Sequence, residues 1–167
     1  MKNKFVILFI LLIGYTIKSF SQFNKQLCKQ NEEIVFAFQL KNQKWVSVCK
    51  EKNEQYIVYR FGLPGKIELQ YPSLLDSTSW RQFNFKGYTR GGGKQNAAMN
   101  YAFLDFINSN IQYEVYETWN SEENKEYCGV SITINKKKVD MRGLLKTRKR
   151  ALLSLLYGNK IKMEEEE

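Results

Sequence analysis

Apolar and polar residues alternate with a period of two along most of this chain, and this pattern limits the fold more than any other feature. Residues 34–40 place Ile, Phe, Phe and Leu at every second position, and residues 130–134 place Val, Ile and Ile in the same way. Successive side chains of a strand point to opposite faces, so the alternation predicts half-buried strands. We expect about eight strands, at residues 34–40, 45–49, 56–61, 67–71, 83–85, 101–107, 111–115 and 130–134.

Short polar segments separate most of these strands, which is typical of antiparallel neighbours. The chain therefore predicts an all-β fold, an antiparallel meander that closes into a barrel or folds into a sandwich. A short C-terminal helix is expected within residues 148–157, where four leucines cluster before Gly158. Longer loops, at residues 72–80, 90–96 and 120–126, are the natural places for a site.

The N-terminus has the features of a secretory signal peptide. Lys2 and Lys4 precede an apolar stretch at residues 5–17, and Ser19 and Ser21 stand before the expected cleavage point. A membrane-spanning helix needs about 20 apolar residues, more than this stretch provides. We expect a signal peptide at residues 1–21, one β domain at 22–158 and a charged tail at 159–167. The protein would then be periplasmic or secreted, with no transmembrane segment after cleavage.

Positive charge is concentrated near the C-terminus. The chain has 26 basic and 17 acidic residues, and within residues 136–150 Asp140 is the single acid. This basic segment could dock on anionic lipid or an acidic envelope partner, or it could be a solvated strand edge. No helix-turn-helix or zinc-finger pattern supports sequence-specific nucleic-acid binding. The basic segment comprises Lys136, Lys137, Lys138, Arg142, Lys146, Arg148, Lys149 and Arg150.

The chain contains no histidine and three cysteines. These numbers exclude Ser-His-Asp triads, Cys-His nucleophiles and structural zinc sites, and we expect no catalytic residue set, no metal and no cofactor. In an oxidising compartment three cysteines permit one intramolecular bridge. Our first choice is Cys28 with Cys49, which requires the chain before Glu33 to fold back. Cys128 would then be the remaining thiol, half-buried in a strand.

A cationic glycine loop is the most unusual local motif. Arg90, Gly91, Gly92, Gly93 and Lys94 are consecutive, and glycines can turn several backbone N–H groups toward one anion. The alternative is a hairpin loop with solvated cations. Arg60 and Tyr88 belong to a set of aromatic and guanidinium groups that could extend such a site by stacking on a ligand; the alternative is that most of the aromatics are core.

Asp105 interrupts an apolar strand, on the face that it shares with Tyr101 and Phe103. A carboxylate there needs a partner, and we expect an ion pair with Arg60. A hydrolase using Asp105 or Asp76 is a third functional hypothesis, although no second acid has a sequence position that completes a catalytic pair.

Several short motifs together resemble a group of small exported bacterial β-rich proteins. They are Tyr-Arg-Phe-Gly at 59–62, Pro-Gly-Lys at 64–66, Tyr-Pro at 71–72 and Tyr-Thr-Arg-Gly-Gly-Gly at 88–93. The resemblance implies an exported β-rich domain and favours the Cys28–Cys49 bridge. It implies no activity.

From the sequence we expect a non-enzymatic, exported binding module. Its cationic glycine loop and nearby aromatic residues would contact an anionic ligand, a glycan or an envelope protein. The competing hypothesis is an envelope-associated structural or assembly protein that docks through the basic segment.

Overall fold

The computed structural model describes residues 26–164, so the expected signal peptide lies outside the described residues. Ten strands and two short 3₁₀ helices follow one another along the chain. The strands are β1 (Glu32–Leu40), β2 (Trp45–Glu51), β3 (Ile57–Leu63), β4 (Lys66–Tyr71), β5 (Asn84–Arg90), β6 (Met99–Asn108), β7 (Ile111–Asn120), β8 (Lys125–Ile134), β9 (Lys137–Lys149) and β10 (Lys162–Met163). The helices are η1 (Ser77–Gln82) and η2 (Leu152–Tyr157).

All ten strands belong to one sheet, in the order β10-β5-β6-β7-β8-β9-β1-β2-β3-β4. Neighbours pair antiparallel, except that β10 pairs parallel with β5. The all-β expectation is confirmed, but the strand count is ten rather than eight. The alternation had missed β9, whose sequence is dominated by charged residues, and the two-residue strand β10.

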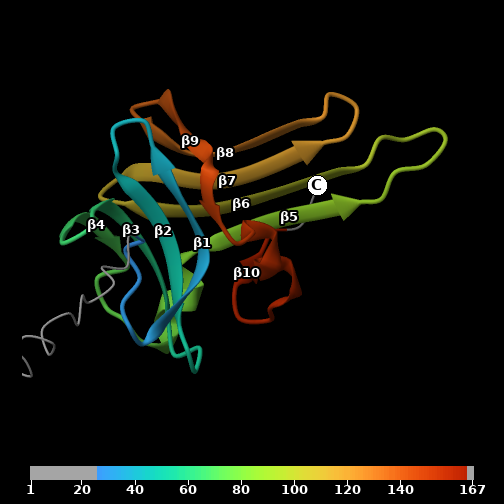
Figure 1. Cartoon of the computed structure of the whole chain (residues 1–167). Coiled ribbons are helices and arrows are strands. Elements are labelled where there is room, and N and C mark those ends of the chain that lie inside the picture. Colours follow the sequence, from blue (N-terminus) through green and yellow to red (C-terminus); the bar gives the residue numbers. More distant parts are fainter. Residues whose placement is uncertain (1–25, 165–167) are drawn as a thin grey trace, which may run out of the picture.

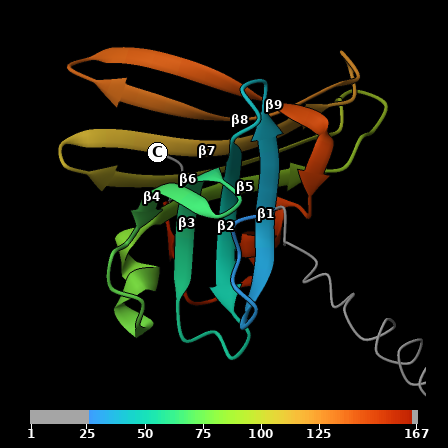
Figure 2. The same cartoon turned by 60° about the vertical axis from the view of Figure 1, so that its left-hand side comes forward.

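The sheet is strongly curled, so that its two halves face each other across one core (Figure 1). Figure 2 shows β1–β3 crossing steeply in front of β5–β7. The pairing of β1 with β9 joins the halves, and its register shifts between Ala37 and Gln39. Gly143 of β9 allows this close approach, because a Cβ there would lie 2.4 Å from the Phe38 ring.

The core lies between the two halves. Phe36, Phe38 and Val48 from the first half meet Phe85 and Leu104 from the second, and all five are fully buried. The alternation predicted from the sequence therefore has a simple structural meaning. Every second residue points into the space that the curled sheet encloses, and the intervening residues form its outer face.

The C-terminal segment completes the fold. The expected helix is the six-residue η2, which packs against β5 and β6. Ile161 is buried, and Lys162–Met163 pair with Asn84 and Phe85. Residues 159–164 are therefore part of the folded domain rather than a charged tail, and the remaining residues, 165–167, lie outside the described range.

Candidate functional site

The outer face of β5–β7 carries side chains that the core does not use. In β6, Ala102, Leu104 and Phe106 point inward and are buried, whereas Tyr101, Phe103 and Asp105 point outward and are only partly buried. The expectation that the last three share one strand face is confirmed. This is the strand geometry dictated by a period of two.

Three aromatic residues run along this face and will be called the aromatic band: Tyr88 of β5, and Tyr101 and Phe103 of β6. Tyr88 lies opposite Tyr101 in the strand register, and their rings stack with centroids 5.4 Å apart. The Tyr101 and Phe103 rings are 5.6 Å apart and tilted by 42°. The band is thus a continuous, partly exposed aromatic surface.

The band is extended on β7 by Tyr116, which lies opposite Phe103. The Tyr116 ring lies over Gly129 of β8, since a Cβ at that glycine would come within 2.3 Å of the phenol oxygen. Its hydroxyl donates a 2.9 Å hydrogen bond to Asp140. Burial is the main reason that the pKa of Tyr116 lies above its ordinary value, so this hydroxyl is protonated.

A pocket of about 610 Å³ begins on the same face and extends to Tyr71 of β4 and to Arg81 and Gln82 of η1. The end of the aromatic band forms one side of it, through Tyr101 and Phe103, and Tyr71 and Phe106 contribute further aromatic surface. The polar groups that line it are Arg81, Gln82, Asn84, Lys86, Asp105, Gln112, Glu114 and Glu164. The pocket thus combines four aromatic side chains with eight polar ones.

Asp105 and Glu114 differ in their electrostatic surroundings. The Glu114 carboxylate accepts a 2.8 Å hydrogen bond from Lys138. Asp105 Oδ1 is buried and has no hydrogen-bond partner among the described residues. Burial, followed by the nearby charges of Glu114 and Glu164, raises the pKa of Asp105 to about 7. Asp105 therefore changes its protonation near neutral pH.

The sequence indicated only half of this arrangement. Asp105 was expected to be unusual, but Glu114 was not expected to lie beside it. The two acids are opposite each other in the pairing of β6 with β7, a register that the short turn at residues 108–110 determines. Aligning the two alternating segments around that turn would have revealed the pair.

The cationic glycine loop begins at the end of β5, two residues after Tyr88. It is part of the connection from β5 to β6 (Figure 1). The Arg90 guanidinium donates two hydrogen bonds to the Ala97 carbonyl, at 3.1 and 3.3 Å. The Gly93 N–H donates to the Asn96 carbonyl. Gly91, Gly92 and Lys94 are exposed. The Arg90 side chain and one glycine N–H are thus engaged within the loop itself.

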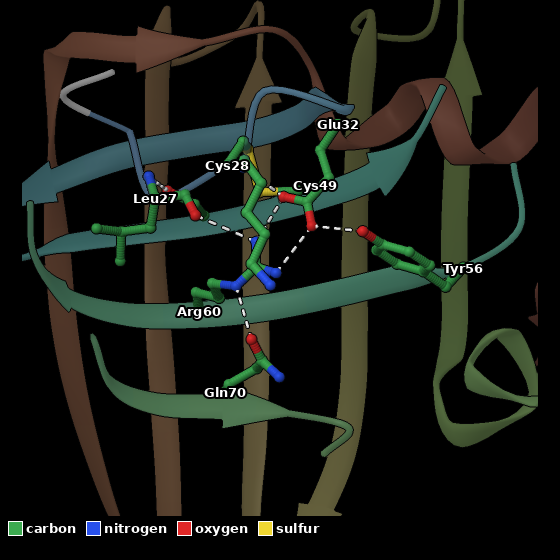
Figure 3. The surroundings of a disulfide bond; sticks show 9 residues. Leu27, Cys28, Glu32, Cys49, Tyr56, Arg60 and Gln70 are labelled. Carbon is green, nitrogen blue, oxygen red and sulfur yellow. Dashed lines mark hydrogen bonds and ion pairs between the residues drawn. A yellow bond between two sulfur atoms is a disulfide. The ribbon is translucent and has the colours of Figure 1, made fainter. Parts of the chain in front are cut away.

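Arg60 lies elsewhere, on the outer side of β3, where the N-terminal segment covers it completely (Figure 3). Its guanidinium contacts the Glu32 carboxylate through two hydrogen bonds of 2.6 and 2.8 Å. It also donates to the Leu27 carbonyl at 3.1 Å and to Gln70 at 2.9 Å. The expected Arg60–Asp105 ion pair is therefore wrong, because the two side chains lie on the outer faces of opposite halves of the sheet.

The Cys28–Cys49 disulfide, our first choice, is present beside this buried pair (Figure 3). It ties the segment before β1 to β2, which brings the Leu27 carbonyl onto Arg60. Burial raises the pKa of Glu32, but hydrogen bonds from Arg60, the Lys29 N–H and Tyr56 outweigh it, so the pKa lies below its ordinary value. In the described part of the chain, Cys28, Glu32 and Cys49 are the one group close enough to hold a metal ion. The disulfide and Arg60 already engage these three residues.

The basic segment does not form one continuous patch. Lys138 contacts Glu114 and Arg142 lies over the Tyr127 ring, both on the outer face. Arg148 points the other way and contacts Glu117 and Glu126. Lys146 and Lys149 line a shallow groove beside Trp45. Lys136 lies in the turn before β9, Lys137 begins that strand, and Arg150 follows it.

Two other residues considered from the sequence, Asp76 and Cys128, lie away from the pocket. Asp76 caps η1 by accepting hydrogen bonds from the Thr78 N–H and hydroxyl. The Cys128 thiol is buried in the core, and burial raises its pKa to about 11, so it is protonated at neutral pH. Neither residue lines the pocket beside the aromatic band.

Comparison with known proteins gives no relative: no family model, no curated protein and no solved structure matches the chain. Within residues 26–164 there is no helix with the length and apolar character needed to cross a membrane. The interpretation of the site therefore rests on its geometry.

Proposed function

We propose that this protein is an exported, non-enzymatic binding module whose ligand is a glycan held on the outer face of β5–β7. The observation that carries this proposal is the aromatic band leading into the 610 Å³ pocket. Sugar rings have an apolar face of C–H groups that packs on aromatic rings, and hydroxyls that bond to carboxylates and amides. The band and the pocket offer both kinds of group side by side.

Two observations favour a glycan over a simple anion. The Arg90 guanidinium, the strongest anion-binding group of the cationic glycine loop, is engaged by the Ala97 carbonyl. Carboxylates outnumber cations among the residues that line the pocket. The loop then serves as an edge of the binding face, next to Tyr88. Export is part of the proposal, and the disulfide supports it because disulfides persist in oxidising compartments.

Calorimetric titration of the protein from residue 22 onward, with cellotriose, maltotriose and the N-acetylglucosamine trimer, tests the proposal. Phe103→Ala is expected to weaken binding of the ligand by about five- to tenfold, the usual contribution of an aromatic contact. Tyr157→Ala is the matched control, because Tyr157 is an aromatic residue on η2 that is 79% exposed and does not line the pocket. Binding that Phe103→Ala leaves unchanged would contradict the proposed site.

A further inference from the structure

We propose that the pocket beside the aromatic band selects saccharides that carry a free amino group, with the ammonium held by Asp105 and its neighbouring carboxylates and the sugar ring packed on Phe103. This inference rests on the proposed function, since it specifies the glycan class for the same site. It follows from the charges around Asp105 and from the shape of the pocket.

One oxygen of the Asp105 carboxylate is unsatisfied, although a hydrogen bond from Gln112 acts on the side chain and lowers its pKa. Its Oδ1 atom is buried without a hydrogen-bond partner among the described residues, which is costly for a carboxylate. The terminal torsion of an aspartate is broad, so the carboxylate can turn either oxygen toward the pocket that it lines. An ammonium group supplies hydrogen-bond donors and a compensating charge together.

Negatively charged side chains outnumber positively charged ones among the residues that line the pocket. Asp105, Glu114 and Glu164 line the pocket, whereas only Arg81 and Lys86 are cations among its lining residues. Lys138, on β9, is held on Glu114. The charges of Glu114 and Glu164 act on Asp105, and Lys138 only partly offsets them. A ligand cation at this point relieves the repulsion between carboxylates, but a neutral hydroxyl does not.

The aromatic and acidic parts of the proposed site are close together. Phe103 and Asp105 are two residues apart on the same outer face of β6, and both line the pocket. Residues i and i+2 of a strand are about 6.5 to 7 Å apart, so one ligand can contact both side chains at once. A ring on Phe103 therefore places a substituent beside Asp105.

Protonation of Asp105 couples this recognition to pH. Burial and the two neighbouring carboxylates raise the pKa of Asp105 to about 7, and a bound ammonium lowers it again. Binding of the amine should therefore release a proton from the protein near neutral pH and weaken as the pH falls from 7 to 6. The groups facing Asp105 are Glu114 and Gln112 on β7, Glu164 after β10, Lys138 on β9, and Asn84 and Lys86 on β5.

The test compares two ligands that differ only at the amino group: the glucosamine trimer and the N-acetylglucosamine trimer, titrated by calorimetry at pH 7. The wild-type protein should bind the amine about tenfold more tightly, as expected for one charged hydrogen bond. Asp105→Asn should remove this preference by weakening binding of the glucosamine trimer about tenfold, to the affinity of the N-acetylated trimer. Glu164→Gln, at the end of the described chain, should reduce the preference without affecting folding.

Three results would overturn the inference. Equal affinities of the two trimers for the wild-type protein would show that the amine is not recognised, and would leave the glycan proposal intact. If Asp105→Asn lost affinity equally for both trimers, the Asp105 carboxylate would instead be bonded to a hydroxyl that both trimers carry. Failure of both trimers to bind would also overturn it, and cellotriose and maltotriose would then decide the proposed function separately. Thermal melting of each variant confirms that the fold is retained.

Discussion

Asp105 lies directly opposite Glu114 in the antiparallel pairing of β6 with β7, so two carboxylates share one face of the sheet. Glu114 forms an ion pair with Lys138, whereas Oδ1 of Asp105 is buried and has no hydrogen-bond partner among the described residues. This asymmetry sets the two acids apart chemically. Burial and the neighbouring carboxylates make the ionised form of Asp105 unfavourable, and this residue lies beside the aromatic band.

The free energy of unfolding should depend on pH through the protonation of Asp105. Burial and the neighbouring charges raise the pKa of Asp105 to about 7, so the folded state retains a proton that the unfolded chain loses above about pH 4. The contribution of Asp105 to the free energy of unfolding therefore falls as the pH rises from about 4 to 7. Asp105→Asn should stabilise the protein by about 1–2 kcal/mol at pH 8 and much less at pH 4. Urea denaturation of both proteins at the two pH values checks this; a variant less stable than wild type at pH 8 would contradict it.

The buried Arg60–Glu32 pair gives a second prediction. Both side chains are fully buried, so removing one charge leaves the other without its partner. Glu32→Met or Arg60→Met should each lower the free energy of unfolding by about 3–5 kcal/mol. The double substitution Glu32→Met with Arg60→Met should cost clearly less than the two single changes added together. Denaturant titration of the four proteins measures this coupling, and simple additivity would argue against it.

The disulfide should contribute stability of its own. The bridge spans 21 residues, and closing a loop of that length is worth about 3 kcal/mol of unfolding free energy. Replacing both Cys28 and Cys49 by Ser should cause a loss of that size, because the segment carrying Leu27 is then free to leave Arg60. The control is wild-type protein melted with and without reductant. An unchanged melting temperature in the double variant would contradict the prediction.

Gly129 should be intolerant of any side chain. A Cβ at this position would lie 2.3 Å from the Tyr116 hydroxyl oxygen and 2.8 Å from the Met141 carbonyl oxygen. Gly129→Ala should therefore destabilise the protein by about 1–3 kcal/mol, the usual cost of overpacking. Adding Tyr116→Ala should recover part of the loss, which thermal melting can measure. Gly91→Ala is a suitable control, because a Cβ there meets nothing within 4 Å.

The sequence predicted the strand class, most of the strands and the disulfide, because these depend on local alternation and on few pairing options. It did not predict the relation of Arg60 to Glu32. Arg60 alternates with the core residue Tyr59, and only the fold-back of the N-terminal segment turns its side of β3 into a buried one. The proximity of Asp105 to Glu114 depends on strand register, which alternation alone leaves open.

Strand β9 was missed for a different reason. Its basic residues obscure the alternation, since it forms part of an exposed surface along most of its length. The basic segment was considered either as a docking surface or as a solvated strand edge. Arg142 and Arg148 are an even number of residues apart, so regular alternation would place them on one face. The register of β9 against β1 shifts between Leu144 and Lys149, and the two arginines contact groups on different sides of the sheet.

The central claim, that a glycan binds the outer face of β5–β7, is tested most directly by mapping amide chemical shifts during a saccharide titration. The probe is the tightest binder among cellotriose, maltotriose and the two aminosugar trimers. The account predicts that the largest shifts fall on the strand residues around Tyr101, Phe103, Asp105 and Glu114, with smaller shifts in the loop at residues 91–96. Shifts confined to that loop would contradict it, as would the absence of any shift with all four saccharides.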